Sequence, residues 1–508
     1  MADGGRPERL YVLHFAQSHL DFRLAEFQAA AEYIGAAYQL EPTPARGVAS
    51  EHAVAGDVSR PFMLCRLADD EAAVRLLQRC SCLRAVWELW ATADTYAELH
   101  ERNRATRHYA RFIPAHYSWK ALIQSFNISI SDARRLRIIN EFSYMAFQGP
   151  TRMRGADLTW GVLEEYARAR QPASESGEDA AELGDQDPRL VQLFLGRKIK
   201  DRSGVVPARD LIDKLNLKKR RYIGNTSMES EMSIVMANMA LSGPSKLVHD
   251  PFAGTGSMLY ACCMFGAYAF GSDIDGRMLR GKNAAPAGGQ RATGVALSAE
   301  QYGLRGRILD CATFDMTRAP WRSSAIDGMV DAIVTDPPYG VRAGAKRLGK
   351  RDTAQQRDEP FVMPDGRLAH QLPDYVPPTR PYRLSELVHD LLNYASALLK
   401  PRGRLVFWIP TMNEDNAETS IPSHPHFALV AHSLQDFGKW GRRLITLEKR
   451  TDTLHIPAPQ RTTIDSEPTR ARASDGELEF RNRVRPHPRR PRSPAAVRTT
   501  AQVAAIVT

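Results

Sequence analysis

Cysteine is scarce in this sequence, and its spacing argues against the structures that cysteine-rich chains build. The 508 residues include six cysteines and no Cys-x-x-Cys pair. This pattern suits neither a zinc site nor a disulfide framework, so no metal site is expected. Reduced thiols are typical of intracellular proteins. We therefore expect the protein in the cytoplasm, with a nuclear presence left open.

Long apolar runs are also missing. No stretch is long enough to span a bilayer, and the first residues lack the apolar segment of a secretory signal. A membrane protein or a secreted one is therefore not expected, nor is a membrane partner.

Negative charge is outweighed by positive charge. Lys and Arg number 68 against 58 Asp and Glu, which gives a net charge of +10. The excess favours a polyanionic partner such as nucleic acid, although part of it falls in a basic tail. The chain is too long for one hydrophobic core, so two or three domains are expected.

Composition and periodicity divide the chain into four regions: 1–165, 166–189, 190–450 and 451–508. The first alternates strand-like stretches (10–15 and 61–67) with helix-like ones (22–31 and 71–80), and the stretches 109–112 and 131–140, the second of them helix-like, continue the alternation. Arg134, Arg135 and Arg137 in the last helix form either a solvated face or contacts to RNA phosphates. The second region is an acidic linker, and the fourth is a basic tail expected to be disordered.

The first candidate binding motif of the third region is a glycine-rich turn between a predicted strand and a predicted helix. The strand 246–249 leads into Asp250-Pro251-Phe252-Ala253-Gly254-Thr255-Gly256. Glycines let the backbone approach a ligand beside a helix N-terminus. No Lys follows Gly256 as a phosphate-binding P-loop requires, and Leu259 would crowd the pyrophosphate of a dinucleotide. S-adenosylmethionine remains, with Asp250 suited to its ammonium group and Phe252 beside it.

Acidic residues follow the next two strands. Asp273 ends the strand 267–272, where a carboxylate can accept both ribose hydroxyls, and Ile274 can pack on the adenine ring. Asp275 is the alternative ribose ligand or the cap of the following helix. Asp315 is placed to bind the adenine amine, with Asp310 as its competitor.

An acceptor site is predicted where the apolar strand 330–335 ends in Asp336-Pro337-Pro338-Tyr339. Two prolines stop the strand and stiffen the turn. A flat base can stack on Tyr339 while its exocyclic amine donates to Asp336 and to the Pro337 carbonyl. Together with the turn at Asp250, this order and spacing predict a class I methyltransferase acting on a nucleobase amine. Seven strands fit its Rossmann-like α/β sheet, the last of them antiparallel.

Segments before and after the cofactor turn narrow the family. Residues 194–197, 209–215, 217–228, 301–304 and 336–342 resemble the corresponding segments of eukaryotic tRNA (guanine-N2) methyltransferases. The resemblance implies an N-terminal α+β region, ferredoxin-like plus THUMP-like, that binds tRNA. It also implies methylation of guanosine 10 and a small zinc-binding activator subunit as partner. Thr226 and Ser227 would contact the methionine end of the cofactor, or Thr226 would cap a helix.

Three other functions stay open at this point. An amine methyltransferase acting on another RNA or on DNA would use a similar Asp336 turn. A non-catalytic RNA-binding subunit would not need Asp250, Asp273 and Asp336. An NAD-dependent enzyme is disfavoured by Leu259.

Overall fold

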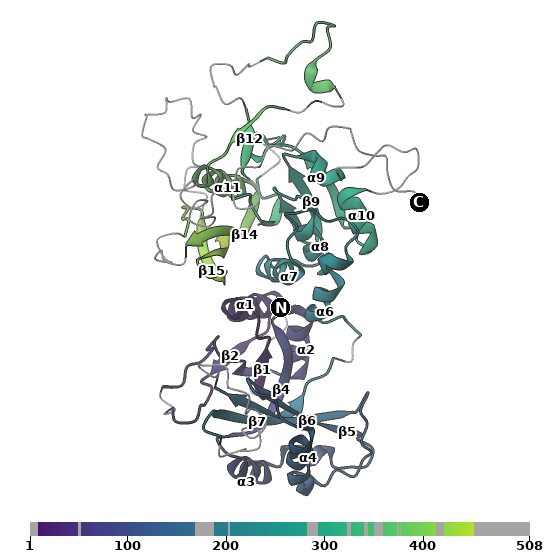
Figure 1. Ribbon diagram of the computed structural model, residues 1–508, viewed down its shortest axis with the longest axis vertical. Coiled ribbons are helices and arrows are strands. Elements are labelled where there is room, and N and C mark those ends of the chain that lie inside the picture. Colours follow the sequence, from purple (N-terminus) through teal and green to yellow (C-terminus); the bar gives the residue numbers. More distant parts are fainter. Residues whose placement is uncertain are drawn as a thin grey trace, which may run out of the picture. The chain divides into compact units, whose positions relative to one another are not determined.

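The structure is a computed structural model. It describes residues 9–48, 52–167, 187–201, 204–281, 293–322, 327–339, 344–349, 359–372, 375, 377–412 and 421–451. Two seven-stranded sheets organise these residues (Figure 1). The predicted tail, apart from Thr451, and most of the acidic linker lie outside the described residues. No helix in the described ranges is both long and apolar enough to cross a membrane.

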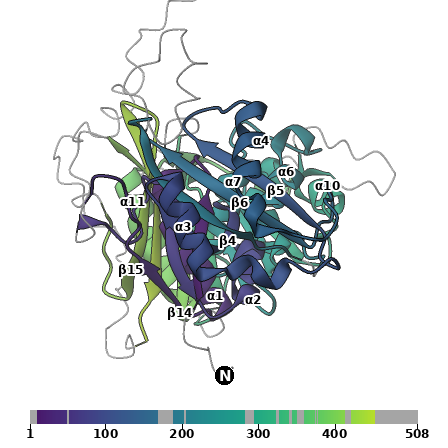
Figure 2. The ribbon, with the colours of Figure 1, turned by 90° about the horizontal axis from the view of Figure 1, so that it is seen from below.

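The first sheet has the strand order β2-β3-β1-β4-β7-β6-β5. Its strands are β1 (Arg9–Phe15), β2 (Tyr38–Glu41), β3 (Phe62–Leu67), β4 (Leu83–Ala93), β5 (Trp119–Phe126), β6 (Leu158–Tyr166) and β7 (Leu190–Lys198). Its helices are α1 (Arg23–Ile34), α2 (Asp70–Arg79), α3 (Tyr96–Thr106) and α4 (Asp132–Glu141). The strands expected at 10–15 and 61–67 and the three expected helices are thus confirmed within a few residues, whereas 109–112 forms part of a short 3-10 helix, His108–Phe112, and adds no strand to the alternation. The helices α3 and α4 lie over the part of the sheet near β6 (Figure 2). Their apolar side chains share one hydrophobic cluster with those of β6 and β7.

The strand β7 corrects the predicted start of the third region at residue 190. It is antiparallel to both β4 and β6, so it is an interior strand of the first sheet. After the linker the chain therefore returns to the first sheet before it enters the second. Residues far apart in sequence can pair in a sheet, and the composition change at the linker marked a connection rather than a domain boundary.

The arginines of α4 do not share one role. Arg134 is 4% exposed and pairs with the buried Glu164 at 2.6 Å, so neither predicted role applies to it. Arg135 pairs with Asp132 on the helix surface at 2.6 Å, and Arg137 is exposed. Arg137 is thus the most exposed of the three, so a contact with RNA phosphates stays a prediction for it.

The second sheet has the strand order β10-β9-β8-β11-β14-β16-β15. Its strands are β8 (Leu247–Asp250), β9 (Tyr268–Asp273), β10 (Ile308–Thr313), β11 (Val330–Thr335), β14 (Leu399–Met412), β15 (Phe427–Asp436) and β16 (Trp440–Lys449). The pairs from β10 through β14 are parallel, and β16 is antiparallel to both of its neighbours. This is the seven-stranded Rossmann-like sheet expected from the sequence.

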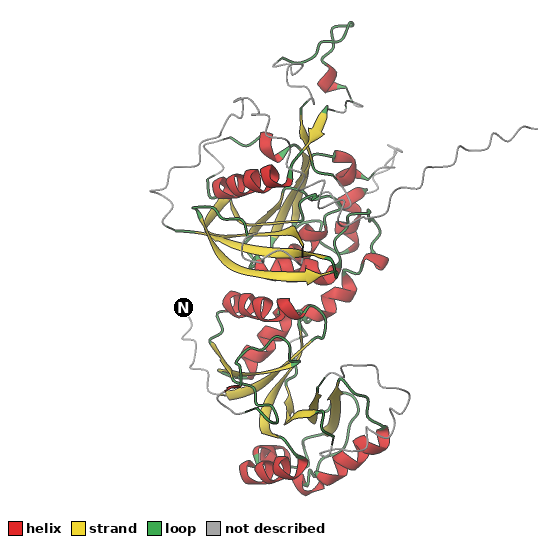
Figure 3. Ribbon diagram, turned by 60° about the vertical axis from the view of Figure 1, so that its left-hand side comes forward, coloured by secondary structure: helices red, strands yellow, loops and turns green. Residues whose placement is uncertain are grey.

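Helices cover both faces of this sheet (Figure 3). They are α6 (Ala208–Lys214), α7 (Ser230–Met239), α8 (Ser257–Met264), α9 (Gly276–Arg280), α10 (Gly294–Gln301) and α11 (Leu384–Leu398). Side chains alternate along a strand, so Val406 and Trp408 pack with α7 and α8 while Leu405 and Phe407 pack with α11. Because both faces are covered, most side chains of the central strands β8, β11 and β14 are apolar and buried, and polar ones such as Asp250 and Thr335 stand at the strand ends.

The two sheets are joined by a common hydrophobic core between α1 and α2 on one side and α7 and α8 on the other (Figure 1). The rings of Phe22 and Trp408 have centroids 5.9 Å apart across this junction. Glu26 on α1 is fully buried and accepts hydrogen bonds from the Ser81 amide at 3.0 Å and from Asn238 Nδ2 on α7 at 2.6 Å. These buried hydrogen bonds of Glu26 connect α1 with α7, and they fix the position of α7 against the first region.

Candidate active site

The acidic residues singled out in the sequence meet at the carboxyl edge of the second sheet. β8, β9 and β11 end at or just before Asp250, Asp273 and Asp336, and these parallel strands are adjacent. A cavity of about 1250 Å³ opens at this edge. It is lined by Thr226, Asp250, Phe252, Gly254, Asp273, Ile274, Asp315, Asp336, Pro337, Pro338 and Tyr339, which are all of the predicted site residues except Gly256.

Asp250 is the most deeply buried carboxylate of the site, with 2% of its surface exposed. Its Oδ1 accepts hydrogen bonds from Thr335 Oγ1 at 2.6 Å and from the Phe252 amide at 3.0 Å. Burial raises the pKa of Asp250 to about 7, and the nearby Asp273 and Asp336 act in the same direction. A cationic ligand would restore the charged form, so Asp250 suits the ammonium group predicted for it.

The glycines of the turn have different roles. The Gly254 amide donates to Asp273 Oδ2 at 2.9 Å, which connects the ends of β8 and β9. Gly256 is the N-cap of α8, with φ at 83°. A Cβ there would lie 2.9 Å from the Tyr260 ring. Gly256 does not line the cavity, so its need for glycine is set by backbone conformation and packing rather than by the expected approach of a ligand.

Asp273 and Asp275, at the end of β9, make different hydrogen bonds. Asp273 Oδ1 accepts the Asp275 amide at 2.8 Å, and burial raises the pKa of the Asp273 carboxyl. Asp275 is the N-cap of α9, where its Oδ1 accepts the Arg277 amide at 3.1 Å. The helix-cap interpretation of Asp275 is thus confirmed, while the ribose role of Asp273 stays a prediction.

The structure separates the two candidates for the adenine amine. Asp315 lines the cavity and is 4% exposed, whereas Asp310 is exposed on β10 and does not line it. Asp315 already accepts from the Thr317 amide at 2.8 Å and the Leu348 amide at 2.6 Å. The Thr317 hydroxyl also donates to Oδ1, at 2.8 Å, so the second lone pair that an amine donor could use is on Oδ2.

Thr226 faces the cavity and does not cap a helix. The next helix, α7, begins at Ser230 with Glu229 as its N-cap. The neighbouring Ser227 forms a hydrogen bond with Thr255 at 2.7 Å, so the 224–228 segment is fastened to the glycine-rich turn. The cap interpretation of Thr226 is therefore wrong.

The acceptor turn lies directly beside the cofactor turn. Thr335, the last residue of β11, donates to Asp250 while its neighbour Asp336 begins the turn. Tyr339 packs partly buried against the hydrophobic core. The continuation at residues 340–342, which also resembled the family, lies outside the described residues.

One further part of the cavity lining was not predicted from the sequence. Gln435, Phe437, Trp440 and Arg442 come from the hairpin of β15 and β16, more than ninety residues after the acceptor turn. Arg442 Nη1 lies 3.8 Å from Asp336 Oδ2. No short motif marks these residues, because strand order alone brings β16 beside β14 and so near β11.

Known proteins match both halves of the chain. The family model "Tmrp11 THUMP N-terminal domain" matches residues 9–200, and "RMKL-like, methyltransferase domain" matches residues 218–352. The tRNA (guanine(10)-N(2))-methyltransferase of Saccharomyces cerevisiae is 33% identical over 448 residues, which cover 88% of this chain and 94% of the yeast protein. TRMT11 of Homo sapiens is 30% identical over 452 residues, with coverages of 86% and 88%.

The chain belongs to the tRNA (guanine(10)-N(2))-methyltransferase family. Membership confirms the resemblance found in the sequence and agrees with the observed methyltransferase sheet. The interpretations as a DNA methyltransferase, an NAD-dependent enzyme or a non-catalytic subunit are not favoured.

S-adenosylmethionine is the methyl donor of this enzyme. The residues present fit it: a buried carboxylate whose pKa is raised suits an ammonium group, and further carboxylates at neighbouring strand ends suit hydroxyl and amine donors. The cavity is also large enough for a cofactor and a base together.

Proposed function

We propose that this chain transfers a methyl group from S-adenosylmethionine to the exocyclic N2 amine of guanosine 10 in tRNA, as a catalytic subunit. One observation carries the proposal. In a chain of this family, the turn Asp336-Pro337-Pro338-Tyr339 lines the same cavity as Asp250, to which it is tied by the 2.6 Å bond from Thr335.

The residues of the acceptor turn would position a weak nucleophile. The lone pair of guanine N2 is delocalised into the ring, and hydrogen bonds to Asp336 and the Pro337 carbonyl would localise it. S-adenosylmethionine supplies an electrophilic methyl group on a sulfonium, so a new N–C bond replaces the S–C bond. The proton lost from N2 would pass to Asp336 or to water. Positioning of this kind can lower a barrier by about 7–11 kcal/mol.

Tyr339 would hold the base that is being methylated. A nucleobase inside an RNA helix is out of reach of the cavity, so guanosine 10 must leave its stack at a cost of a few kcal/mol. Stacking on an aromatic side chain returns about 1–3 kcal/mol of this. The proposed roles of Pro337 and Pro338 are to keep the turn rigid and to present its carbonyl group.

The first region would bind the body of the tRNA. Double-helical RNA is recognised by shape and by phosphate contacts. Exposed arginines supply such contacts on this region: Arg102, Arg104, Arg107, Arg137, Arg152 and Arg154. Their substitution should raise KM for tRNA without changing KM for the cofactor.

A small zinc-binding activator subunit is the proposed protein partner. Support comes from the family resemblance and from β15, the outer strand of the second sheet, which exposes Leu429 (48%) and Val430 (42%). The chain expressed alone should be poorly soluble or inactive, and full activity of the purified monomer would remove this proposal.

We also propose a cytoplasmic location with a nuclear fraction, which imaging of a tagged full-length chain would test.

Methylation of tRNA transcripts with guanosine 10 replaced tests the activity. Labelled methyl groups should enter the unmodified transcript, and the replacement should abolish their transfer. Duplex DNA, run in parallel, should accept none. Activity that survives the replacement would refute the assignment of guanosine 10, and wild-type activity of Asp336→Ala would refute the catalytic role of Asp336.

A further inference from the structure

A guanidinium lies beside the acceptor carboxylate. Arg442, on β16, is 9% exposed, and its Nη1 is 3.8 Å from Asp336 Oδ2. The guanidinium also lies over the ring of Trp408, with its carbon 4.2 Å from the ring centroid. An arginine stacked on an aromatic ring keeps its plane, so its N–H groups point in fixed directions.

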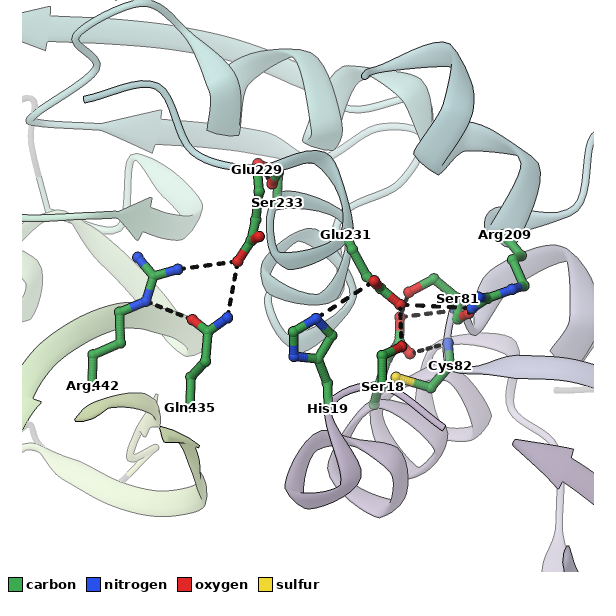
Figure 4. A network of polar contacts seen from close by, with 11 residues as sticks. Ser18, His19, Ser81, Cys82, Arg209, Glu229, Glu231, Ser233, Gln435 and Arg442 are labelled. Atoms are coloured by element: carbon green, nitrogen blue, oxygen red, sulfur yellow. Dashed lines mark hydrogen bonds and ion pairs between the residues drawn. The ribbon is translucent and has the colours of Figure 1, made fainter. Parts of the chain in front are cut away.

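A second set of contacts holds the other side of this guanidinium. Arg442 Nε donates to Gln435 Oε1 at 2.7 Å, and Nη2 lies 3.4 Å from Glu229 Oε1. Gln435 Nε2 in turn donates to the same Glu229 oxygen at 2.9 Å. Figure 4 shows the three side chains converging from α7 and from the β15–β16 hairpin. Arg442 is therefore fixed from behind while one of its nitrogens faces Asp336.

Glu229 is itself anchored by the first turn of α7. It is the N-cap residue of that helix, and its carbonyl accepts from Ser233 Oγ at 2.8 Å. Glu231, in the same turn, accepts from Ser18 Oγ at 3.0 Å and lies 3.5 Å from His19 Nε2 (Figure 4). Contacts with the first region thus set the position of the helix end from which Glu229 reaches Arg442.

We propose that Arg442 is a positioning residue of the methyl transfer, which orients the Asp336 carboxylate toward the N2 amine of the incoming guanine. The proposal rests on the proposed function. A carboxylate turns easily about its last side-chain bond, because that torsion has broad minima. A fixed cation 3.8 Å from one oxygen favours one orientation of the carboxylate, and an error of about 1 Å in the alignment of reacting groups can cost about 10²-fold in rate.

Two other roles for Arg442 make different predictions. An arginine that bound a tRNA phosphate would contribute to KM for tRNA, and a lysine could replace it as a point charge. An ion pair that only stabilised the hairpin would contribute to unfolding temperature. A positioning arginine contributes to kcat, and lysine replaces it poorly because it lacks the planar fork and the stacking face.

The test compares Arg442→Met and Arg442→Lys with a matched control in the full chain, in the form that methylates tRNA. Arg443→Met is the control, since Arg443 is also buried (7%) on β16 but pairs with His432 at 3.0 Å rather than with Asp336. Arg442→Met should lower kcat about 10²-fold, with both KM values within about twofold of wild type. Arg442→Lys should recover only a small part of the loss, and Arg443→Met should retain wild-type kcat.

A second variant removes the support instead of the cation. Glu229→Gln keeps an oxygen that can accept from Arg442 but loses the charge, so kcat should fall less, by about threefold to tenfold. Wild-type kcat in Arg442→Met would overturn the proposal. So would a raised KM for tRNA with normal kcat, or an equal loss of kcat in Arg443→Met accompanied by an equal loss of melting temperature.

The same experiments separate this inference from the proposed function. If Asp336→Asn is inactive and Arg442→Met is normal, the positioning role alone fails. If Asp336→Asn methylates guanosine 10 at the wild-type rate, the proposed role of Asp336 fails, and the role of Arg442 fails with it.

Discussion

Cofactor binding should depend on pH through Asp250. Burial raises the pKa of this carboxyl to about 7 in the cofactor-free protein, and an ammonium ligand favours its ionised form. Binding therefore lowers the pKa of Asp250 and releases a proton, so affinity rises with pH. About three quarters of Asp250 is ionised at about pH 7.5 but only about 3% at about pH 5.5. The Kd for the cofactor should thus rise about 25-fold when the pH falls from about 7.5 to about 5.5, which corresponds to a loss of ~1.9 kcal/mol of binding free energy.

Calorimetry with S-adenosylhomocysteine measures this effect without turnover. The product keeps the ammonium group, whose own pKa of about 8 leaves it mostly charged over this range. Titrations in two buffers with different heats of ionisation count the protons, and about 0.9 should be released per ligand near pH 6. Asp250→Asn should bind more weakly and lose most of the pH dependence. The remainder would come from Asp273, whose pKa burial also raises.

Substitutions at two residues near Asp250 should shift the pKa of its carboxyl, and with it the midpoint of the pH dependence of cofactor binding, in opposite directions. Thr335→Val keeps the shape of the side chain but removes the hydroxyl that donates to Asp250 at 2.6 Å, so the pKa should rise further. Asp336→Asn removes a nearby negative charge, so the pKa should fall. A Kd that is constant over the range, or binding without proton release, would refute this account of Asp250.

Three further predictions concern stability and the acceptor base. Glu26→Ala leaves several buried donors without their acceptor, among them Asn238, and should lower the free energy of unfolding by ~3 kcal/mol or more in urea titrations; a change below ~1 kcal/mol would contradict this. Gly256→Ala should cost about 3 kcal/mol in the same assay, against about 1 for Gly303→Ala, which has a similar positive φ but open space around its Cβ. Equal costs would show that contact with the ring is unimportant. Tyr339→Ala should lower kcat/KM for tRNA about 10–100-fold while Tyr339→Phe retains most of it, and equal losses would point to the hydroxyl instead of the ring.

Much of the methyltransferase fold could be predicted because its central strands are buried on both faces and therefore appear in the sequence as short apolar runs. The apolar stretches at 246–249, 267–272 and 330–335 each became a strand within one or two residues of the expected ends. The carboxyl ends of neighbouring parallel strands lie at the same edge of a sheet, so the sequence alone was enough to place Asp250, Asp273 and Asp336 in one site. The strand β7 could not be assigned to the first sheet from the sequence, because the residues of a strand do not indicate which sheet it joins.

Sequence by itself determined the chemistry of the donor and acceptor turns, since a glycine-rich turn after Asp250 and the rigid turn at Asp336 act through residues adjacent in the chain. Only the tertiary structure decided which side chains from distant parts of the chain contact these turns. Arg442 reaches Asp336 because β16 inserts between β14 and β15, and it is held there by Glu229 from α7. Contacts of this kind depend on strand order and helix docking, which are set by the whole hydrophobic core and leave no signal at the residues themselves.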